Sequence, residues 1–163
     1  MKYFGRERER RRSVLEVKER IARDGVKKRL KAYKEDLDYI DIKKDKIRNL
    51  RSSIDGIKAS MSSTEAVQGG STSQEDKIIK VLDKISNIEK EIQEINEENS
   101  DIRYALNSIK EPSHKSIVYH VWINSDMSME QMGRKLHLST TAIWKRSDKT
   151  LKYINKILNQ YNM

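Results

Sequence analysis

The feature that most constrains the fold is an unbroken apolar heptad between residues 78 and 109. Nine of its ten a and d positions are aliphatic, while the other faces carry Glu, Lys, Asp and Asn. The ten positions are Ile78, Val81, Ile85, Ile88, Ile92, Ile95, Asn99, Ile102, Leu106 and Ile109. Such a helix is unstable alone in water, because its apolar stripe needs a partner. We predict one long helix here, in which Asn99 at an a position fixes register or oligomer state.

A second amphipathic helix is predicted over residues 26–58, where apolar residues recur at steps of three and four around an interruption at Lys43 and Lys44. The connecting stretch 59–76 is rich in Ser and Thr, contains Gly69-Gly70 and has no Lys or Arg, which predicts a loop. Two partners for the heptad stay open. The preceding helix can fold back to form an antiparallel hairpin, which we favour, or a second copy of the chain can supply the same stripe; both can also occur together.

The fold class we predict is all-α, with a long antiparallel helical hairpin (a coiled coil) and a C-terminal helix-turn-helix domain. Residues 1–12 are predicted to form a flexible basic arm. A short helix follows over 13–24, with Ser13 and Glu16 as a capping box and Gly25 as its end. Glu111-Pro112 should end the heptad helix, because proline disfavours helical geometry in the residue before it. The predicted segments are therefore 1–25, 26–110 and 111–163.

Charge and composition narrow the possible partners. Of the 163 residues, 36% are apolar, none is cysteine, and no apolar run reaches the roughly 20 residues that span a bilayer. We expect a soluble protein of the cytoplasm (the host cytoplasm, if a phage encodes it) without a membrane partner. The net charge is +9; residues 1–33 carry 13 Lys and Arg against 5 Asp and Glu, and residues 111–163 carry 8 against 4. Two basic ends around a nearly neutral middle favour a nucleic-acid partner.

The C-terminal segment carries the pattern of a helix-turn-helix. Ile117, Val118, Val121 and Trp122 form the apolar face of a first helix, and Asn124-Ser125-Asp126 turns the chain. Ser128 can cap a second helix that buries Met129, Met132 and Leu136, and Gly133 stands where a further helix would press against it. After a tight turn at His137-Leu138, Ser139 can cap a helix from Thr140 to about Leu158. This order of capped helix, small residue, turn and capped helix is typical of DNA-binding domains.

On this interpretation the partner is double-stranded DNA. The base-contacting residues are predicted to be Thr140, Thr141, Trp144 and Lys145. The phosphate-contacting residues are predicted to be Arg134, Ser139, Lys149 and Lys152, together with Arg10, Arg11 and Arg12 of the N-terminal arm. Two roles stay open for Trp144, which can pack against the first helix or touch a thymine methyl or a sugar.

The stretch SMEQMGRKLHLSTTAIWKR (128–146) also resembles the helix-turn-helix of region four of bacterial sigma factors. LKAYKEDLDYIDI (30–42), AVQGGSTSQEDKIIKVLDKISNIEKEIQEIN (66–96) and the C-terminal motif, in this order, resemble phage transcriptional regulators of the ArpU/RinA type from Gram-positive bacteria. This resemblance covers roughly residues 30–158. It implies a phage protein that binds promoter DNA and activates late genes, with host RNA polymerase as a further partner.

Other chemistry finds little support. His114 and His120 are six residues apart and lie off one helical face, so we predict no metal site, and nothing indicates a cofactor. Gly69-Gly70 lacks the Lys-Ser/Thr of a phosphate loop, and no catalytic residues are predicted. The favoured function is a sequence-specific transcriptional regulator that is homo-oligomeric, with a dimer favoured. The alternatives are a small terminase-type DNA-packaging protein and a protein-binding adaptor that acts on host RNA polymerase.

Overall fold

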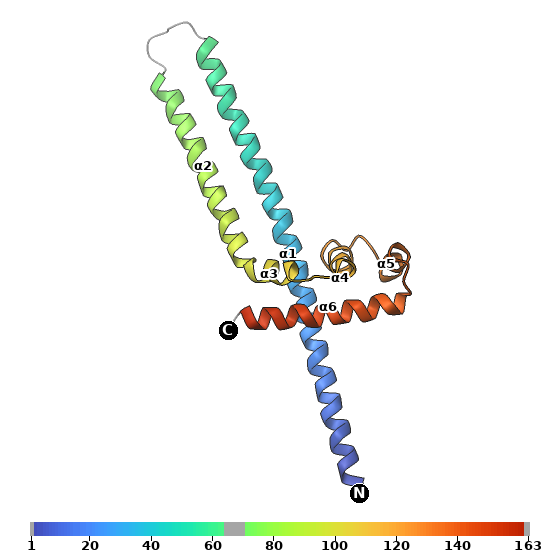
Figure 1. Ribbon diagram of the computed structural model, residues 1–163. Coiled ribbons are helices and arrows are strands. Elements are labelled where there is room, and N and C mark those ends of the chain that lie inside the picture. The colour runs from blue at the N-terminus through green and yellow to red at the C-terminus, as the bar shows by residue number, and fades with distance from the viewer. Residues whose placement is uncertain (1, 64–70, 162–163) are drawn as a thin grey trace. The chain divides into compact units, whose positions relative to one another are not determined.

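The computed structural model describes residues 2–63 and 71–161, and its side chains at residues 14–60 and 74–161. Every regular element in these ranges is a helix, so the described chain is all-helical (Figure 1). The elements are α1 (Lys2–Ser63), α2 (Ser71–Glu98), α3 (Ser100–Asn107), α4 (Pro112–Ile117), the π-helical segment η1 (Val118–Ile123), α5 (Met129–Leu136) and α6 (Thr140–Tyr161). The predicted loop at 59–76 was too long, because residues 59–63 belong to α1 and residues 71–76 to α2. Residues 64–70 lie outside the described residues.

The chain forms two compact units, and the boundary between them falls inside α1. One unit combines Met1–Glu35 with Asn99–Met163, and we call it the terminal unit. The other unit is Asp36–Glu98, which we call the middle unit. The predicted division at residues 25 and 110 was drawn from local sequence alone and stays a prediction.

Two expectations for the N-terminal region were wrong. Residues 2–12 are helical rather than a flexible arm, so no helix begins at Ser13 as predicted. α1 also continues through Gly25, where a helix end was predicted. Arg and Glu are good helix formers, which explains the first difference. A Cβ at Gly25 would meet no atom within 4 Å, while the next residue, Val26, is buried. Burial of the residues that follow therefore outweighs the cost of about 1 kcal/mol for glycine within a helix.

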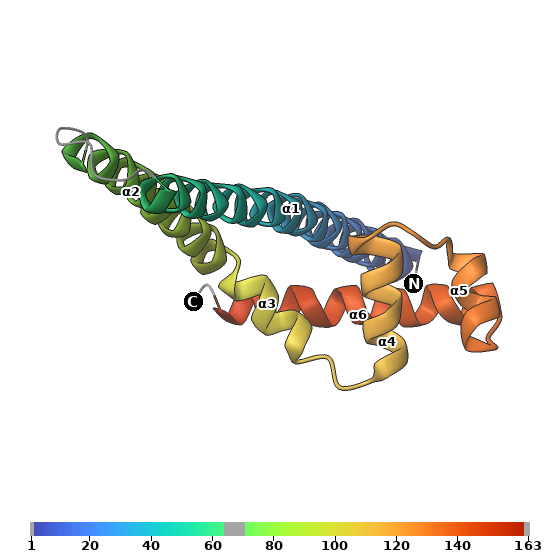
Figure 2. The same ribbon diagram turned by 90° about the horizontal axis from the view of Figure 1, so that it is seen from above.

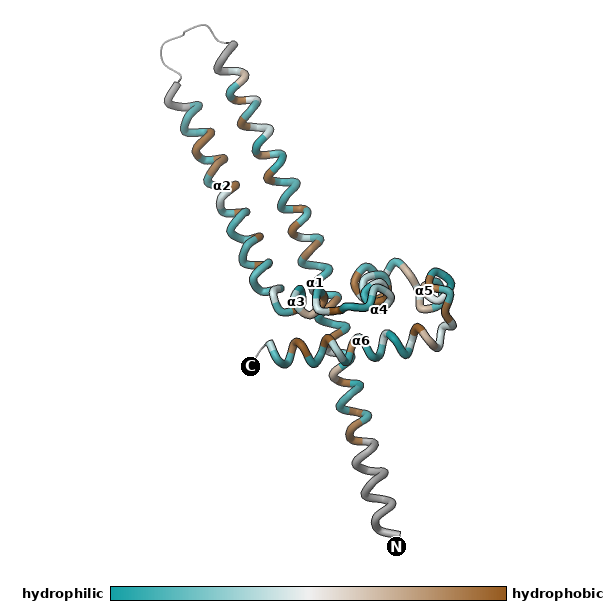
Figure 3. Tube along the Cα trace, in the orientation of Figure 1, coloured by the Kyte–Doolittle hydropathy of each residue, from teal (hydrophilic) through white to brown (hydrophobic). Residues whose placement is uncertain are grey.

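The middle unit is held together by isoleucines from both of its helices. Ile47 and Ile54 of α1 form a buried cluster with Ile85 and Ile88 of α2, and the two helices run in opposite directions (Figures 1 and 3). The partly buried residues packed against this cluster are Leu50, Ile78, Val81 and Ile92. Each fully buried isoleucine contributes roughly 1.5–3 kcal/mol to folding. The apolar stripe of α2 thus finds a partner within the same chain.

Lys43, which interrupts the apolar stripe of α1, is accommodated by a partner on α2. Its Nζ donates a hydrogen bond to Glu91 Oε2 at 2.5 Å and lies 4.9 Å from the ring centre of Tyr39. The hydrogen bond to Glu91 raises the pKa of Lys43 above its ordinary value. A second pair joins Arg51 to Glu89 at 3.0 Å, so polar contacts flank the isoleucine cluster.

The predicted unbroken helix over 78–109 was wrong at Asn99. This residue lies between α2 and α3 with φ −95° and ψ 8°, and its side chain is buried. Its Oδ1 accepts a hydrogen bond from Arg29 Nη1 at 2.8 Å, while Arg29 Nη2 pairs with Asp101 at 2.8 Å. A buried amide must keep a hydrogen-bond partner, and Asn readily leaves helical geometry. The predicted single helix is therefore two helices: α2, which ends the middle unit, and α3, which belongs to the terminal unit. Ile109 lies beyond the end of α3.

In the terminal unit, α6 is the helix against which α3, α4 and α5 all pack (Figure 2). The cluster around its N-terminal half consists of Ile117, Met129, Met132 and Ile143. Pro112 stands at the first turn of α4, where its missing N–H has no cost. The predicted turn at 124–126 is present: Ser125 has a positive φ of 53°, and His120 Nδ1 lies 3.0 Å from Asp126 Oδ1.

Two glycines of the terminal unit should respond to alanine in opposite ways. A Cβ at Gly133 would lie 2.8 Å from the Leu138 carbonyl oxygen, which belongs to the backbone, so Gly133→Ala should lower the free energy of unfolding by about 1–3 kcal/mol. At Gly25 a Cβ meets open space, so Gly25→Ala should raise it by roughly 0.5–1 kcal/mol. Urea unfolding followed by circular dichroism measures both. Equal effects of the two variants would contradict the tight packing at Gly133.

Candidate nucleic-acid interface

The candidate interface begins at the cap of α5, which was predicted correctly. Ser128 Oγ accepts a hydrogen bond from Gln131 N at 3.2 Å, and Ser128 N donates to Gln131 Oε1 at 2.7 Å. This reciprocal capping box satisfies two backbone N–H groups at the helix start. Met129 and Met132 are then directed into the core of the terminal unit. The cap thus fixes both where α5 begins and which face it buries.

A three-residue turn joins α5 to α6 and depends on Gly133. Leu138 N donates to Gly133 O at 2.9 Å, and the Leu138 side chain packs against the core as predicted. His137 occupies the left-handed region, with φ 55° and ψ 43°, although glycine is the usual residue for such a helix end. The turn is therefore short, and it brings the start of α6 close to α5.

The start of α6 is capped as the sequence predicts. Ser139 Oγ accepts a hydrogen bond from Ala142 N at 3.1 Å, and Ile143 N donates to Ser139 O at 3.1 Å. Beyond the cap, the helix buries one face through Ile143, Ser147 and Leu151. This burial fixes the rotation of α6 about its own axis.

The opposite face of the first turns of α6 points to solvent. All four residues predicted to contact bases are exposed, and they are Thr140, Thr141, Trp144 and Lys145. Trp144 is 52% exposed. Of its two predicted roles, contact with a thymine methyl or a sugar fits this exposure better than packing against the first helix. Trp144 and Lys145 follow Thr141 by three and four residues, so each shares a face of the helix with Thr141.

The residues predicted to contact phosphate differ in their surroundings. Ser139 and Lys149 are exposed, and Arg134 is exposed with an ion pair to Glu130 one turn earlier at 2.8 Å. Lys152 instead lies between two carboxylates, at 2.8 Å from Glu19 and 3.4 Å from Asp148. The side chains of Arg10, Arg11 and Arg12 lie outside the described residues.

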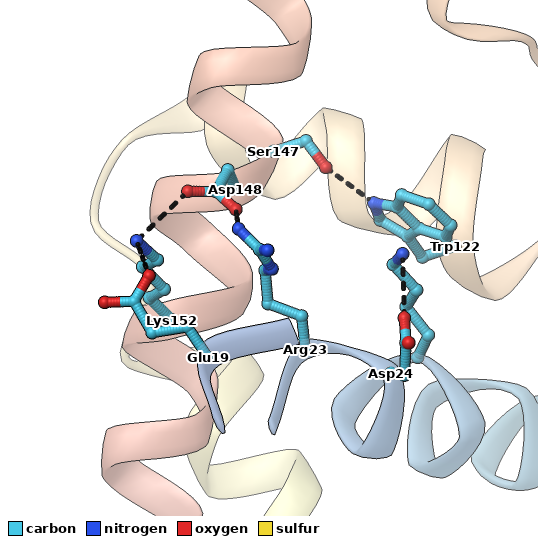
Figure 4. Close-up of polar contacts among 8 residues, drawn as sticks. Glu19, Arg23, Asp24, Trp122, Ser147, Asp148 and Lys152 are labelled. Carbon is cyan, nitrogen blue, oxygen red and sulfur yellow. Dashed lines mark hydrogen bonds and ion pairs between the residues drawn. The ribbon is translucent and has the colours of Figure 1, made fainter. Parts of the chain in front are cut away.

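Lys152 belongs to a charge cluster that joins α1 to α6 (Figure 4). Asp148 of α6 also pairs with Arg23 of α1, so two cations and two carboxylates alternate across the helices. The hydrogen bond to Glu19 raises the pKa of Lys152 above its ordinary value. Sequence reasoning missed this cluster, because Glu19 and Arg23 are more than 120 residues away from their partners.

Trp122 is held beside the same cluster, as Figure 4 shows. Its Nε1 donates to the buried Ser147 Oγ at 2.7 Å, and the ammonium of Lys27 lies 4.7 Å from its ring centre. Trp122 also packs against the core of the terminal unit, as predicted. Nearby, Arg146 Nη1 donates to Ser113 Oγ at 2.9 Å, which ties α6 to α4.

Metal-binding clusters and membrane spans are both absent from the residues that the structure describes. In this part of the chain, no group of three or more His, Asp or Glu side chains is arranged to hold a metal ion. None of the helices described is both long and apolar enough to cross a membrane.

Comparison with known proteins places the chain in a family. The family described as "Protein of unknown function (DUF1492)" matches residues 56–155, which is more than half of the chain. The chain belongs to this family. No curated protein and no solved structure matches this chain. The DUF1492 region includes all of α2 to α5 and α6 as far as residue 155, and so it contains the capped turn and the exposed face of α6.

Replacement of His137 by glycine should stabilise the terminal unit. A non-glycine residue at φ 55° carries a steric cost, and the His137 side chain is exposed. We expect His137→Gly to raise the free energy of unfolding by roughly 0.5–1 kcal/mol. Lys135→Gly, within regular helix α5, is the control and should lower it by about 1 kcal/mol. Destabilisation by both variants would contradict the strain at His137.

His114 should make the stability depend on pH. Burial lowers the pKa of His114 below its ordinary 6.5; Glu111 at 3.8 Å opposes this, while Lys149 and Arg146 add to it. The folded protein therefore favours the neutral form of His114. The stability that this residue contributes is fully present above pH about 6.5 and is lost as the pH falls through its pKa in the folded protein. When the pH is lowered from about 7.5 to about 5, the free energy of unfolding should fall less in His114→Gln than in the parent protein. Parallel pH profiles would contradict this prediction.

Proposed function

We propose that this protein is a sequence-specific DNA-binding regulator of transcription whose α5, turn and α6 act as a helix-turn-helix. The observation that carries the proposal is the exposed N-terminal face of α6, which directly follows a three-residue turn. The major groove of B-DNA is about 12 Å wide and admits one helix. A helix with one face anchored by Ile143 and Leu151 and the other exposed has the form that such a groove requires.

The side chains on the exposed face offer suitable chemistry for the major groove. Lys145 can donate hydrogen bonds to guanine O6 and N7, and the hydroxyl of Thr141 can bond to several base edges. Trp144 offers apolar surface to a thymine methyl group or a sugar. At the start of α6, backbone N–H groups can approach a phosphate, which is favoured there by the helix dipole.

For phosphate contacts, the charge environment favours Arg134 and Lys149 over Lys152. Lys149 has no ion pair with a described side chain, whereas Lys152 lies between Glu19 and Asp148. A phosphate that approaches Lys152 would also meet those two carboxylates. We therefore expect Lys152 to support the contact between α1 and α6 more than it attracts DNA.

The larger architecture fits the same proposal. The two antiparallel helices of the middle unit would act as a coiled-coil hairpin, and pairing of two chains in a dimer would set the distance between two half-sites. The resemblance to ArpU/RinA-type regulators supports activation of phage late genes, with host RNA polymerase as a further partner.

A protein-binding adaptor is the second candidate, and one observation favours it. Val14, Leu15, Val17 and Ile21 of α1 are all exposed large apolar side chains within about two turns of helix. Such a run is a feature of surfaces that bind other proteins. An adaptor of this kind would bind a protein partner without any affinity for duplex DNA.

The test is DNA selection followed by mutation. Fragments bound from a random duplex pool define a preferred site, and fluorescence anisotropy compares that site with an unrelated duplex. Lys145→Ala should cost about 1–3 kcal/mol on the selected site and much less on the unrelated one. Lys149→Ala should weaken binding to both duplexes alike and reduce the salt dependence.

Three outcomes would count against the proposal. Absence of binding at low salt would exclude DNA binding and favour the adaptor. Binding without any preferred sequence would exclude specific regulation. Equal behaviour of the Lys145 and Lys149 variants on both duplexes would contradict the assigned division between base and phosphate contacts.

A further inference from the structure

Beside the exposed face of α6 lies a cleft of about 300 Å³ between α1 and α6 within the terminal unit. On the α1 side the lining residues are three cations and one carboxylate, namely Arg20, Arg23, Lys27 and Asp24. On the α6 side they are Trp144, Ser147, Asp148 and Leu151, so both carboxylates of the cleft, Asp24 and Asp148, already have a cation as partner. Trp122 also lines the cleft, and the hydrogen bond to Ser147 holds its indole in place. This cleft shares Trp144 with the face of α6 that is proposed to enter DNA.

Among the described side chains, the cations that line the cleft are paired except for one. Arg23 is bound to Asp148, and Lys27 contacts both Asp24 at 3.3 Å and the Trp122 ring (Figure 4). Arg20 is exposed and forms no ion pair with any described side chain. The cleft therefore carries one cation that is available to a ligand, held on a helix whose position the neighbouring pairs fix.

The chemistry of this arrangement suits an anion joined to an apolar ring. A guanidinium can form two parallel hydrogen bonds with a phosphate, and its charge does not depend on pH. The half-exposed indole of Trp144 offers a flat apolar surface next to it, on which a sugar can pack. Every nucleotide of a nucleic-acid backbone joins a phosphate to a sugar ring.

We propose that this cleft binds one sugar-phosphate unit of the DNA backbone, with Arg20 on the phosphate and Trp144 against the deoxyribose. The inference rests on the proposed function and adds a contact from α1, outside the helix-turn-helix. The contact reads no base. It positions α6 along the groove, and it gives the charge cluster of Glu19, Arg23, Asp148 and Lys152 the role of holding Arg20 beside the recognition face.

Three variants of the full chain test this proposal by anisotropy over a range of salt concentrations. Arg20→Ala should reduce affinity roughly tenfold on the selected site and on an unrelated duplex, and should lower the salt slope by about 1. Arg20→Lys keeps the charge and should retain the slope. Lys46→Ala, an exposed cation of α1 in the middle unit, removes the same charge and should change neither quantity. Thermal melting checks that all three variants fold.

The outcomes separate the two proposals. If the parent protein binds DNA and Arg20→Ala binds equally well, the cleft is not a backbone site, while the proposed function stands. A loss on the selected duplex alone would assign Arg20 to a base and overturn the inference. An equal loss in Lys46→Ala would show a general effect of charge and overturn it as well. If the parent binds no duplex at any salt concentration, both proposals fail.

Discussion

The close approach of α5 and α6 at Gly133 is the constraint on which the rest of the candidate interface depends. A side chain there would meet the Leu138 carbonyl oxygen, so only glycine lets the backbone of the turn lie this close to α5. The short turn then sets where Ser139 caps α6, and burial of Ile143 sets its rotation. The exposure of Thr141 and Lys145 follows from these two conditions, because they lie on the face opposite to the buried residues.

A second set of contacts fixes α6 from the other side. Arg23, Asp148, Glu19 and Lys152 form a partly exposed charge cluster, and such contacts contribute little to stability one at a time. Their effect is geometric, since they hold α1 against the middle of α6. The cluster therefore joins two helices that are remote in sequence.

Much of the local geometry of the candidate interface could be predicted from the sequence, because its signals are local. The caps at Ser128 and Ser139, the close approach at Gly133 and the inward Leu138 all depend on residues less than a dozen positions apart. The errors arose where distant contacts decide the structure. α1 continues past Gly25 because the residues that follow it are buried. The predicted heptad helix is interrupted at Asn99, whose side chain accepts a hydrogen bond from Arg29. The ion pair between Lys152 and Glu19 could not be predicted either, because the two residues are far apart in the sequence.

If the exposed face of α6 reads the major groove, modification of base edges in that groove should block binding, and methylation interference on a selected duplex measures this effect. Dimethyl sulfate modifies guanine at N7 in the major groove and adenine at N3 in the minor groove. N7 methylation at a few guanines of the site should abolish binding, and Lys145→Ala should remove the effect at one of them. Interference at adenine N3 alone would contradict major-groove recognition by α6.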